Sequence, residues 1–220
     1  MTRKVWFIVL CGVVIVMIGG GLRQTFGVFL RPFSLDLEIG REMFSLVIGA
    51  QALIYGISQP VAGLFADRYG PIRVIVAGAV LYAAGLWLAS SIATAFDLYL
   101  SLGLLVGLGL SGPTQVLVLG VVSKVVPESH RSMIFGTIIA SASLGMFLFV
   151  PAVQELIDSL DWRQSFTVLA VAIALIPLIA FGLRSGPKME PVGAKQSIGE
   201  AIGEARSHSG YVLLTFGFFV

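Results

Sequence analysis

The chain has 220 residues, of which 57% are hydrophobic and only 12% are charged. A soluble globular chain carries about 25% charged residues, so this composition excludes a water-soluble domain. Intrinsic disorder is excluded as well, because it requires low hydrophobicity and high charge. The net charge of +2 says little by itself, and the single cysteine, Cys11, excludes an intrachain disulfide and a CxxC-type metal or redox motif.

Six long windows without a charged residue follow one another along the chain. A helix needs about 20 apolar residues to cross a hydrocarbon core of about 30 Å, and these windows are 18 to 26 residues long. They cover residues 5–22, 43–66, 74–96, 98–123, 132–154 and 164–183. The pattern predicts an all-α, polytopic membrane protein with a six-helix bundle over residues 1–184.

The first window follows Arg3 and Lys4, as the apolar region of a signal peptide would. It leads into three glycines without a small-residue cleavage site, and five further windows come after it. We therefore interpret it as the first membrane helix. We expect this helix to continue past Arg23 to about Phe33 and to be loosened by the glycines at 19–21.

Beyond residue 183 the composition turns polar, and residues 185–209 are predicted to form a cytoplasmic linker. Within the linker, residues 196–206 place apolar side chains at helical intervals, which is typical of a short amphipathic helix on a membrane surface. Residues 210–220 are apolar again and predict the start of a seventh membrane helix. We expect a second, C-terminal six-helix half as the partner of this unit.

The distribution of lysine and arginine indicates the orientation, because cytoplasmic connections carry an excess of these residues. If the N-terminus is cytoplasmic, the outside connections hold only Arg31, Arg41 and Arg163. The inside segments then hold Arg3, Lys4, Arg68, Arg73, Lys124, Arg131, Arg184, Lys188, Lys195 and Arg206. We predict a multi-pass protein of the cell (plasma or inner) membrane with a cytoplasmic N-terminus.

The connection between the second and third windows reads GLFADRYGPIR. It resembles the signature loop of the major facilitator superfamily, approximately G-x-L-A-D-R-x-G-R-K, although Ile72 stands where a second basic residue is common. The resemblance implies a conformational latch between two six-helix halves and a secondary transporter that works by alternating access. The residues that match the pattern are Gly63, Asp67, Arg68, Gly70 and Arg73. The alternative is an ordinary basic cytoplasmic loop.

A spacing that occurs twice in the chain agrees with this architecture. Pro60 precedes Asp67 by seven residues, and Pro151 precedes Asp158 by the same interval. In the predicted topology the two pairs face opposite sides of the membrane, as an inverted three-plus-three repeat requires.

Small residues in the fourth and fifth windows predict close helix packing at Gly103, Gly107, Gly136 and Gly145. Gly136 and Gly145 have the spacing of the superfamily's antiporter motif, but the Gly-Pro that completes the motif is missing. Gly103 occupies the position of the superfamily's helix-four arginine, so a mechanism that uses that arginine is excluded. Gly112 and Pro113 are expected to bend the fourth helix.

Short segments are similar to the monocarboxylate-transporter-like branch of the superfamily, which includes oxalate-formate exchangers. These segments are GGGLRQTFGVFLRP, DLEIGREMFSLVIG and DWRQSF. The similarity implies a small carboxylate as substrate.

Arg23 is the one ionisable residue predicted to lie within a membrane helix, where such a side chain is a functional candidate. A guanidinium there could bind a carboxylate in a bidentate manner, or it could extend to the outer headgroups. Gln51, Tyr55 and Gln59 repeat at intervals of four and share one helix face, which either binds substrate or bonds between helices. The predicted substrate-binding residues are Arg23, Gln24, Gln51, Tyr55 and Gln115.

No carboxylate lies at core depth in the six windows, so proton coupling would come from the second half. No hydrolase, zinc-protease, Walker or dinucleotide motif is present, and we expect no enzyme activity, cofactor, metal site or nucleic-acid partner. The prediction is a secondary transporter that moves a small organic anion, in particular a monocarboxylate, with or without a coupling ion. The alternatives are a carrier of a neutral or amphipathic solute, and a membrane sensor or assembly subunit that does not transport.

Overall fold

The computed structural model describes residues 2–37, 40–183 and 210. The chain divides into two compact units, residues 1–189 and 190–220, and the fold below is that of the first unit. The predicted linker at 185–209, its amphipathic helix at 196–206 and the seventh span at 211–220 lie outside the described residues.

Every regular element among the described residues is a helix, which confirms the predicted all-α fold. The elements are α1 (Arg3–Arg23), η1 (Phe26–Phe29), α2 (Leu30–Asp36), α3 (Arg41–Tyr69), α4 (Pro71–Ala89), α5 (Ala95–Leu98), η2 (Tyr99–Leu105), α6 (Val106–Gly109), α7 (Gln115–Val122), α8 (Glu128–Leu160), α9 (Trp162–Ala174) and α10 (Ile176–Gly182). Five of the six predicted spans are apolar helical segments of membrane length, although the first and the last are built from more than one element: Arg3–Asp36, Arg41–Tyr69, Pro71–Ala89, Glu128–Leu160 and Trp162–Gly182.

The fourth span is divided. Its first part, α5–η2–α6, contains a seven-residue π-helical segment, and its second part, α7, begins only at Gln115. Between the two parts Pro113 lacks an N–H donor, and the Thr114 hydroxyl accepts a hydrogen bond from the Leu117 N–H at 3.4 Å. The bend expected at Gly112 and Pro113 is therefore a complete break followed by a newly capped helix.

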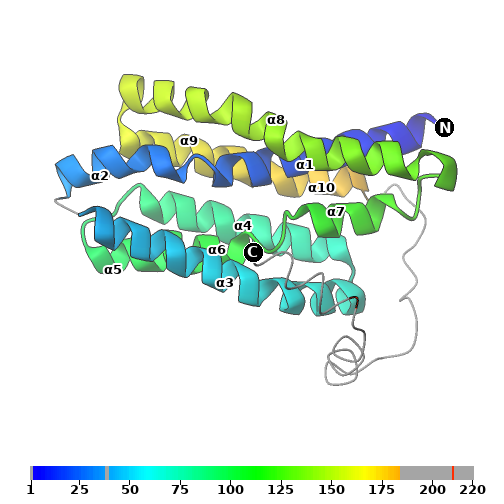
Figure 1. Cartoon of the computed structure of the whole chain (residues 1–220), viewed down its shortest axis with the longest axis horizontal. Helices are drawn as coiled ribbons and strands as arrows, with labels where there is room; N and C mark the ends of the chain where they lie inside the picture. Colours follow the sequence, from blue (N-terminus) through cyan, green and yellow to red (C-terminus); the bar gives the residue numbers. More distant parts are fainter. Residues whose placement is uncertain (1, 38–39, 184–209, 211–220) are drawn as a thin grey trace. The chain divides into compact units, whose positions relative to one another are not determined.

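The helices lie side by side along the long axis of the unit, with α1 against α8 and α4 against both α9 and α6 (Figure 1). The α1–α8 contact depends on Gly21, where an added Cβ would come within 2.7 Å of the Gly145 Cα. The expectation that glycines 19–21 loosen the helix is wrong, because α1 runs through them without interruption. They allow close packing instead, and α1 ends only after Arg23.

The turns after α3 and α8 have the same backbone geometry. Gly70 has φ 90° and ψ 140°, and Asp161 has φ 87° and ψ 153°. Each N–H donates to the carbonyl four residues earlier, at 2.9 Å for Gly70 and 3.2 Å for Asp161. The two turns are separated by 161 − 70 = 91 residues, as are Pro60 and Pro151. The same interval therefore separates both the prolines in the sequence and the turns in the backbone, which supports an inverted repeat.

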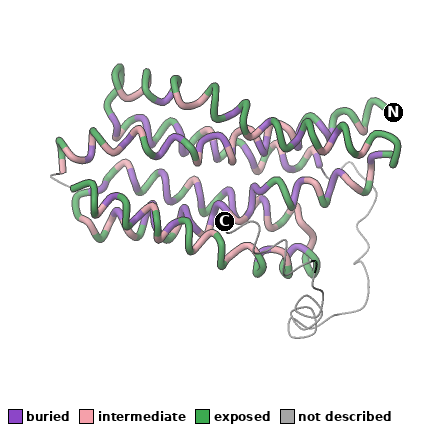
Figure 2. The backbone as a smooth tube through the Cα atoms, in the orientation of Figure 1, coloured by how far each residue is buried: buried purple, intermediate pink, exposed green. Residues whose placement is uncertain are grey.

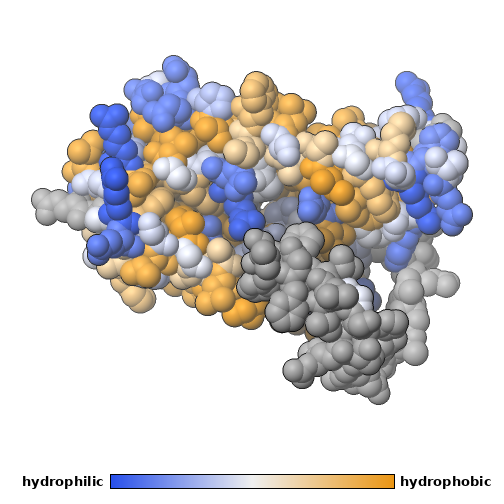
Figure 3. Space-filling view, in the orientation of Figure 1, coloured by the Kyte–Doolittle hydropathy of each residue, from blue (hydrophilic) through white to orange (hydrophobic). Residues whose placement is uncertain are grey.

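Two helices leave most of their surface uncovered by the rest of the unit. Within its apolar window, α3 is 17% buried and α8 is 22% buried, compared with 50% for Arg3–Asp36. Figure 2 shows exposed residues along both helices. In Figure 3 hydrophilic residues gather mainly at the two ends of the unit, and hydrophobic residues cover much of the surface between them. This distribution suits a bundle that spans a membrane.

The connections at one end of the unit are held together by polar contacts. The Trp162 Nε1–H donates to Asp36 Oδ2 at 2.7 Å, and the Arg163 guanidinium lies 4.3 Å from the Trp162 ring centroid. Arg163 also donates to the Ile92 carbonyl at 3.1 Å. At the start of α5, hydrogen bonds from the Thr94 side chain and from backbone N–H groups hold the pKa of Asp97 below its ordinary range.

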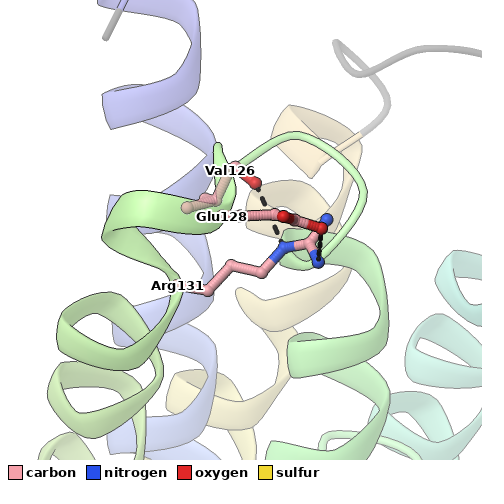
Figure 4. Close-up of polar contacts among 3 residues, drawn as sticks. All are labelled: Val126, Glu128 and Arg131. Carbon is pink, nitrogen blue, oxygen red and sulfur yellow. Dashed lines mark hydrogen bonds and ion pairs between the residues drawn. The ribbon is translucent and has the colours of Figure 1, made fainter.

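At the opposite end of the unit, the first turn of α8 carries a local ion pair. Arg131 reaches back from α8 to Glu128 Oε1 at 3.4 Å and to the Val126 carbonyl at 3.3 Å (Figure 4). Both side chains of the pair are largely accessible, so its contribution to stability is small.

Candidate substrate-binding site

Arg23 is the last residue of α1 and stands at a local interruption of the first span. The Thr25 hydroxyl donates to the Leu22 carbonyl at 2.8 Å, and η1 replaces the α-helix from Phe26. A hydroxyl that bonds to a nearby carbonyl offers the backbone an alternative to the regular ladder. Arg23 is half-buried and lies at the C-terminal end of a helix, where the helix dipole favours a cation.

The Arg23 guanidinium lies over the ring of Tyr55, 4.5 Å from the ring centroid. Tyr55 is half-buried in the middle of α3, so this cation–π contact joins the first and second spans. Such a contact uses the ring face and leaves the N–H groups of the guanidinium available to a ligand.

No hydrogen bond or ion pair among the described residues involves the Arg23 guanidinium. An arginine has five N–H donors in a planar fork, which matches the two oxygens of a carboxylate. A half-buried fork with unused donors in the middle of an apolar bundle is chemically suited to an anion. The positive charge of Arg23 would attract such an anion into the apolar part of the bundle.

Tyr82, on α4, is not among the residues that the sequence predicts for the site. It is fully buried, with a ring centroid 6.4 Å from that of Phe26, and its backbone packs closely on Gly109. Phe26 follows Arg23 by three residues, so Tyr82 packs beside the interruption at which α1 ends. The Tyr82 hydroxyl is buried without a hydrogen-bond partner among the described residues. A tyrosine in the middle of a charge-free window is the sequence signal that points to it.

Gln51 is 3% exposed, and its Nε2 donates to the Leu102 carbonyl at 2.9 Å. Leu102 lies in the π-helical segment η2, where backbone bonding departs from the α-helical ladder. The Gln51 amide therefore bonds between the second and fourth spans, which is one of the two roles considered for the polar face of α3.

The other predicted polar residues are not gathered at Arg23. Gln24 is the exposed C-cap of α1, and Gln115 is the exposed first residue of α7. Gln59 is half-buried, one turn after Tyr55 along α3. No contact described in the structure joins any of these three side chains to Arg23. The structure joins Arg23 to Tyr55, and Tyr82 packs on Phe26 beside the interruption of the first span.

A separate open groove of about 690 Å³ lies on the N-terminal half of α3, beside η2. Its lining is mainly apolar and includes Glu42 but no cation. An exposed carboxylate repels an anionic ligand. On chemical grounds we therefore place the candidate site at Arg23 and not in this groove, which is lined by Glu42, Ser45, Leu46, Gly49, Ala50, Leu53 and Tyr99.

The predicted latch residues lie at the α3–α4 turn. Gly70 forms the turn with positive φ, and α4 begins at the next residue, Pro71. Asp67, Arg68 and Arg73 are exposed, and the Arg68 guanidinium lies 5.4 Å from the Tyr69 ring centroid. At Gly63 no atom of the described residues lies within 4 Å of the position that a Cβ would take. The charged groups of the turn are thus available to a partner.

The predicted packing glycines differ in their surroundings. An added Cβ at Gly145 would meet the Met17 carbonyl, and one at Gly107 would stand 3.1 Å from the Gln51 carbonyl oxygen. At Gly103 the nearest atoms are at ordinary contact distance, the closest being Tyr99 Cδ1 at 3.7 Å. Around Gly136 the described part of the chain leaves open space. No group of three or more metal-binding side chains occurs among the described residues.

The fold and the site together define a polytopic helical membrane protein with a basic group inside its bundle. The model of the Major Facilitator Superfamily matches residues 9–220, and the chain belongs to this family.

Relatives at low identity agree with the assignment. Monocarboxylate transporter 13 of Rattus norvegicus is 28% identical over 177 residues, which cover 80% of this chain and 40% of that protein. The uncharacterized MFS-type transporter YhjX of Escherichia coli (strain K12) is 29% identical over 191 residues, covering 86% and 46%. The chain thus spans less than half the length of these relatives.

The fold is also that of a solved transporter. The crystal structure of the POT family transporter PepTSo superposes with a TM-score of 0.68 at 18% sequence identity. The match covers 94% of this chain and 42% of that one. It supports the six-helix arrangement described above.

Proposed function

We propose that this chain belongs to a secondary transporter that moves a small organic anion, a monocarboxylate, by alternating access. The observation that carries the proposal is the Arg23 guanidinium, which lies over Tyr55 with its N–H donors unused by the described residues. A bound carboxylate would neutralise this charge and accept its hydrogen bonds. Relatives named monocarboxylate transporters agree with this substrate class.

The uncovered faces of α3 and α8 support a second part of the proposal. We infer that a C-terminal six-helix half covers them and that the substrate cavity lies between the halves. The exposed Asp67 would then latch the cytoplasmic side, and the N-terminus would be cytoplasmic. A coupling proton would use a carboxylate of the second half.

Uptake into proteoliposomes tests the substrate class. The full-length protein should take up labelled acetate, propanoate or benzoate in a saturable manner, and the other acids should compete. The matching amides, which have nearly the same shape without the charge, should neither enter nor compete. The 220-residue chain alone serves as a control and should show no saturable uptake.

Two other results would contradict the proposal. Equal transport of acids and amides would favour a carrier of neutral solutes in which Arg23 only extends to the headgroups. Binding of the acids without uptake would favour a sensor or assembly subunit.

A further inference from the structure

The Tyr82 hydroxyl is a polar group for which the fold itself supplies no partner. The side chain is fully buried, and its oxygen has no hydrogen-bond partner among the described residues. Buried polar side chains in native proteins nearly always have a partner, so an orphan calls for an explanation. Packing does not explain it, because a phenylalanine ring would fill the same space beside Phe26 and Gly109 without burying an oxygen.

The surroundings of the hydroxyl indicate what kind of partner would suit it. Tyr82 packs on Phe26, which follows Arg23 by three residues at the interruption of the first span, and Arg23 is a hydrogen-bond donor only. Arg23 N–H groups and the Tyr82 O–H are therefore two sets of unused donors in one region of the bundle. A carboxylate offers two oxygens with about four acceptor sites, so one ligand can satisfy both sets.

We propose that Tyr82 is a substrate-binding residue whose hydroxyl donates a hydrogen bond to the carboxylate held by Arg23. This inference rests on the proposed function and adds a third span to the site, since Arg23, Tyr55 and Tyr82 lie on α1, α3 and α4. The Tyr82 side chain is fully buried in the described structure, so the substrate reaches the hydroxyl only when a neighbouring side chain moves. Phe26, whose ring packs on Tyr82 at the interruption of the first span, is a neighbour whose movement would open such a path.

The test compares Tyr82→Phe with the parent in the full-length protein. Because the variant loses only an orphan oxygen, its melting temperature without substrate should be equal to or higher than that of the parent. Its affinity for propanoate should fall about ten- to hundred-fold, the range expected for loss of a hydrogen bond to a charged group. Propanamide provides the neutral comparison, and Tyr99→Phe, at the outer end of the fourth span, provides a matched hydroxyl deletion that should leave both quantities unchanged.

The outcomes separate this inference from the proposed function. If Tyr82→Phe binds propanoate like the parent while Arg23→Gln does not, the role of Tyr82 is refuted and the anion site at Arg23 stands. A lower melting temperature with unchanged affinity would also refute it, because the hydroxyl would then serve the fold. If Arg23→Gln binds propanoate normally, the proposed function itself fails.

Discussion

The guanidinium of Arg23 and the ring of Tyr55 are 4.5 Å apart, measured from Cζ to the ring centroid, and they connect the first span to the second. The contact holds a cation inside an apolar bundle without using its hydrogen-bond donors. It gives Arg23 a defined position before any anion arrives, and pre-organisation of this kind lowers the entropy that binding must overcome.

Replacement of Tyr55 tests this positioning. Tyr55→Leu removes the ring and should weaken binding of propanoate by about 2- to 30-fold, which corresponds to a cation–π contribution of about 0.5 to 2 kcal/mol. Tyr55→Phe keeps the ring and should lose less. Isothermal titration of the purified full-length protein measures both. Equal affinity of Tyr55→Leu and the parent would show that the ring does not position Arg23.

Gln51 offers a test of the contact between the second and fourth spans. Gln51→Leu keeps the volume but leaves the buried Leu102 carbonyl without its donor, so it should lower the free energy of unfolding by about 1 to 3 kcal/mol. Thermal unfolding in detergent measures the loss. Gln154→Leu is the matched control, because Gln154 donates only to the exposed Asp158. The interpretation is wrong if the two variants unfold alike.

The turn at Gly70 requires a backbone conformation that side chains disfavour. Gly70→Ala places a Cβ at φ 90° and should destabilise the protein by about 1 to 3 kcal/mol. Gly40→Ala is the control, since Gly40 has φ −64° and open space around it. Comparing their unfolding temperatures checks the prediction, and a neutral Gly70→Ala would contradict the turn geometry.

Asp67 tests the latch. In the full-length protein Asp67→Asn should shift the population toward the inward-open state, because the proposed latch contact of Asp67 with a helix N-terminus would contribute about 0.3 to 1 kcal/mol, and up to about 2 when partly buried. Labelling of introduced cysteines from the two sides measures the shift. Asp158→Asn, at the equivalent position of the repeat, should not open the cytoplasmic side. Unchanged labelling in Asp67→Asn would contradict the latch and favour an ordinary basic cytoplasmic loop.

The sequence predicts the spans well because charge-free length is a strong physical constraint in a bilayer. It also places the interruption of the fourth span, since Pro113 cannot donate a backbone hydrogen bond. The π-helical segment η2 escapes prediction, because its bonding register depends on packing against α3 and on the Gln51 contact.

The candidate site is only partly readable from the sequence. A charge inside an apolar helix points to Arg23, but its neighbours come from helices that are distant in the chain. The role of glycines 19–21 escapes the sequence for the same reason, since only the fold shows that they pack on α8 and Pro113. Whether a buried hydroxyl such as that of Tyr82 has a partner is likewise a property of the tertiary structure.

Carboxylate affinity in Arg23→Lys and Arg23→Gln tests the central claim most directly. In the parent the proposed carboxylate pairs with the planar fork of donors of Arg23. Affinity for the carboxylate should therefore be lower in Arg23→Lys, although the charge is kept, and lower still in Arg23→Gln. The loss of a charge-assisted hydrogen bond corresponds to about ten- to hundred-fold in the dissociation constant for propanoate. At equal membrane abundance, parent-like affinity in both variants would contradict an anion site at Arg23.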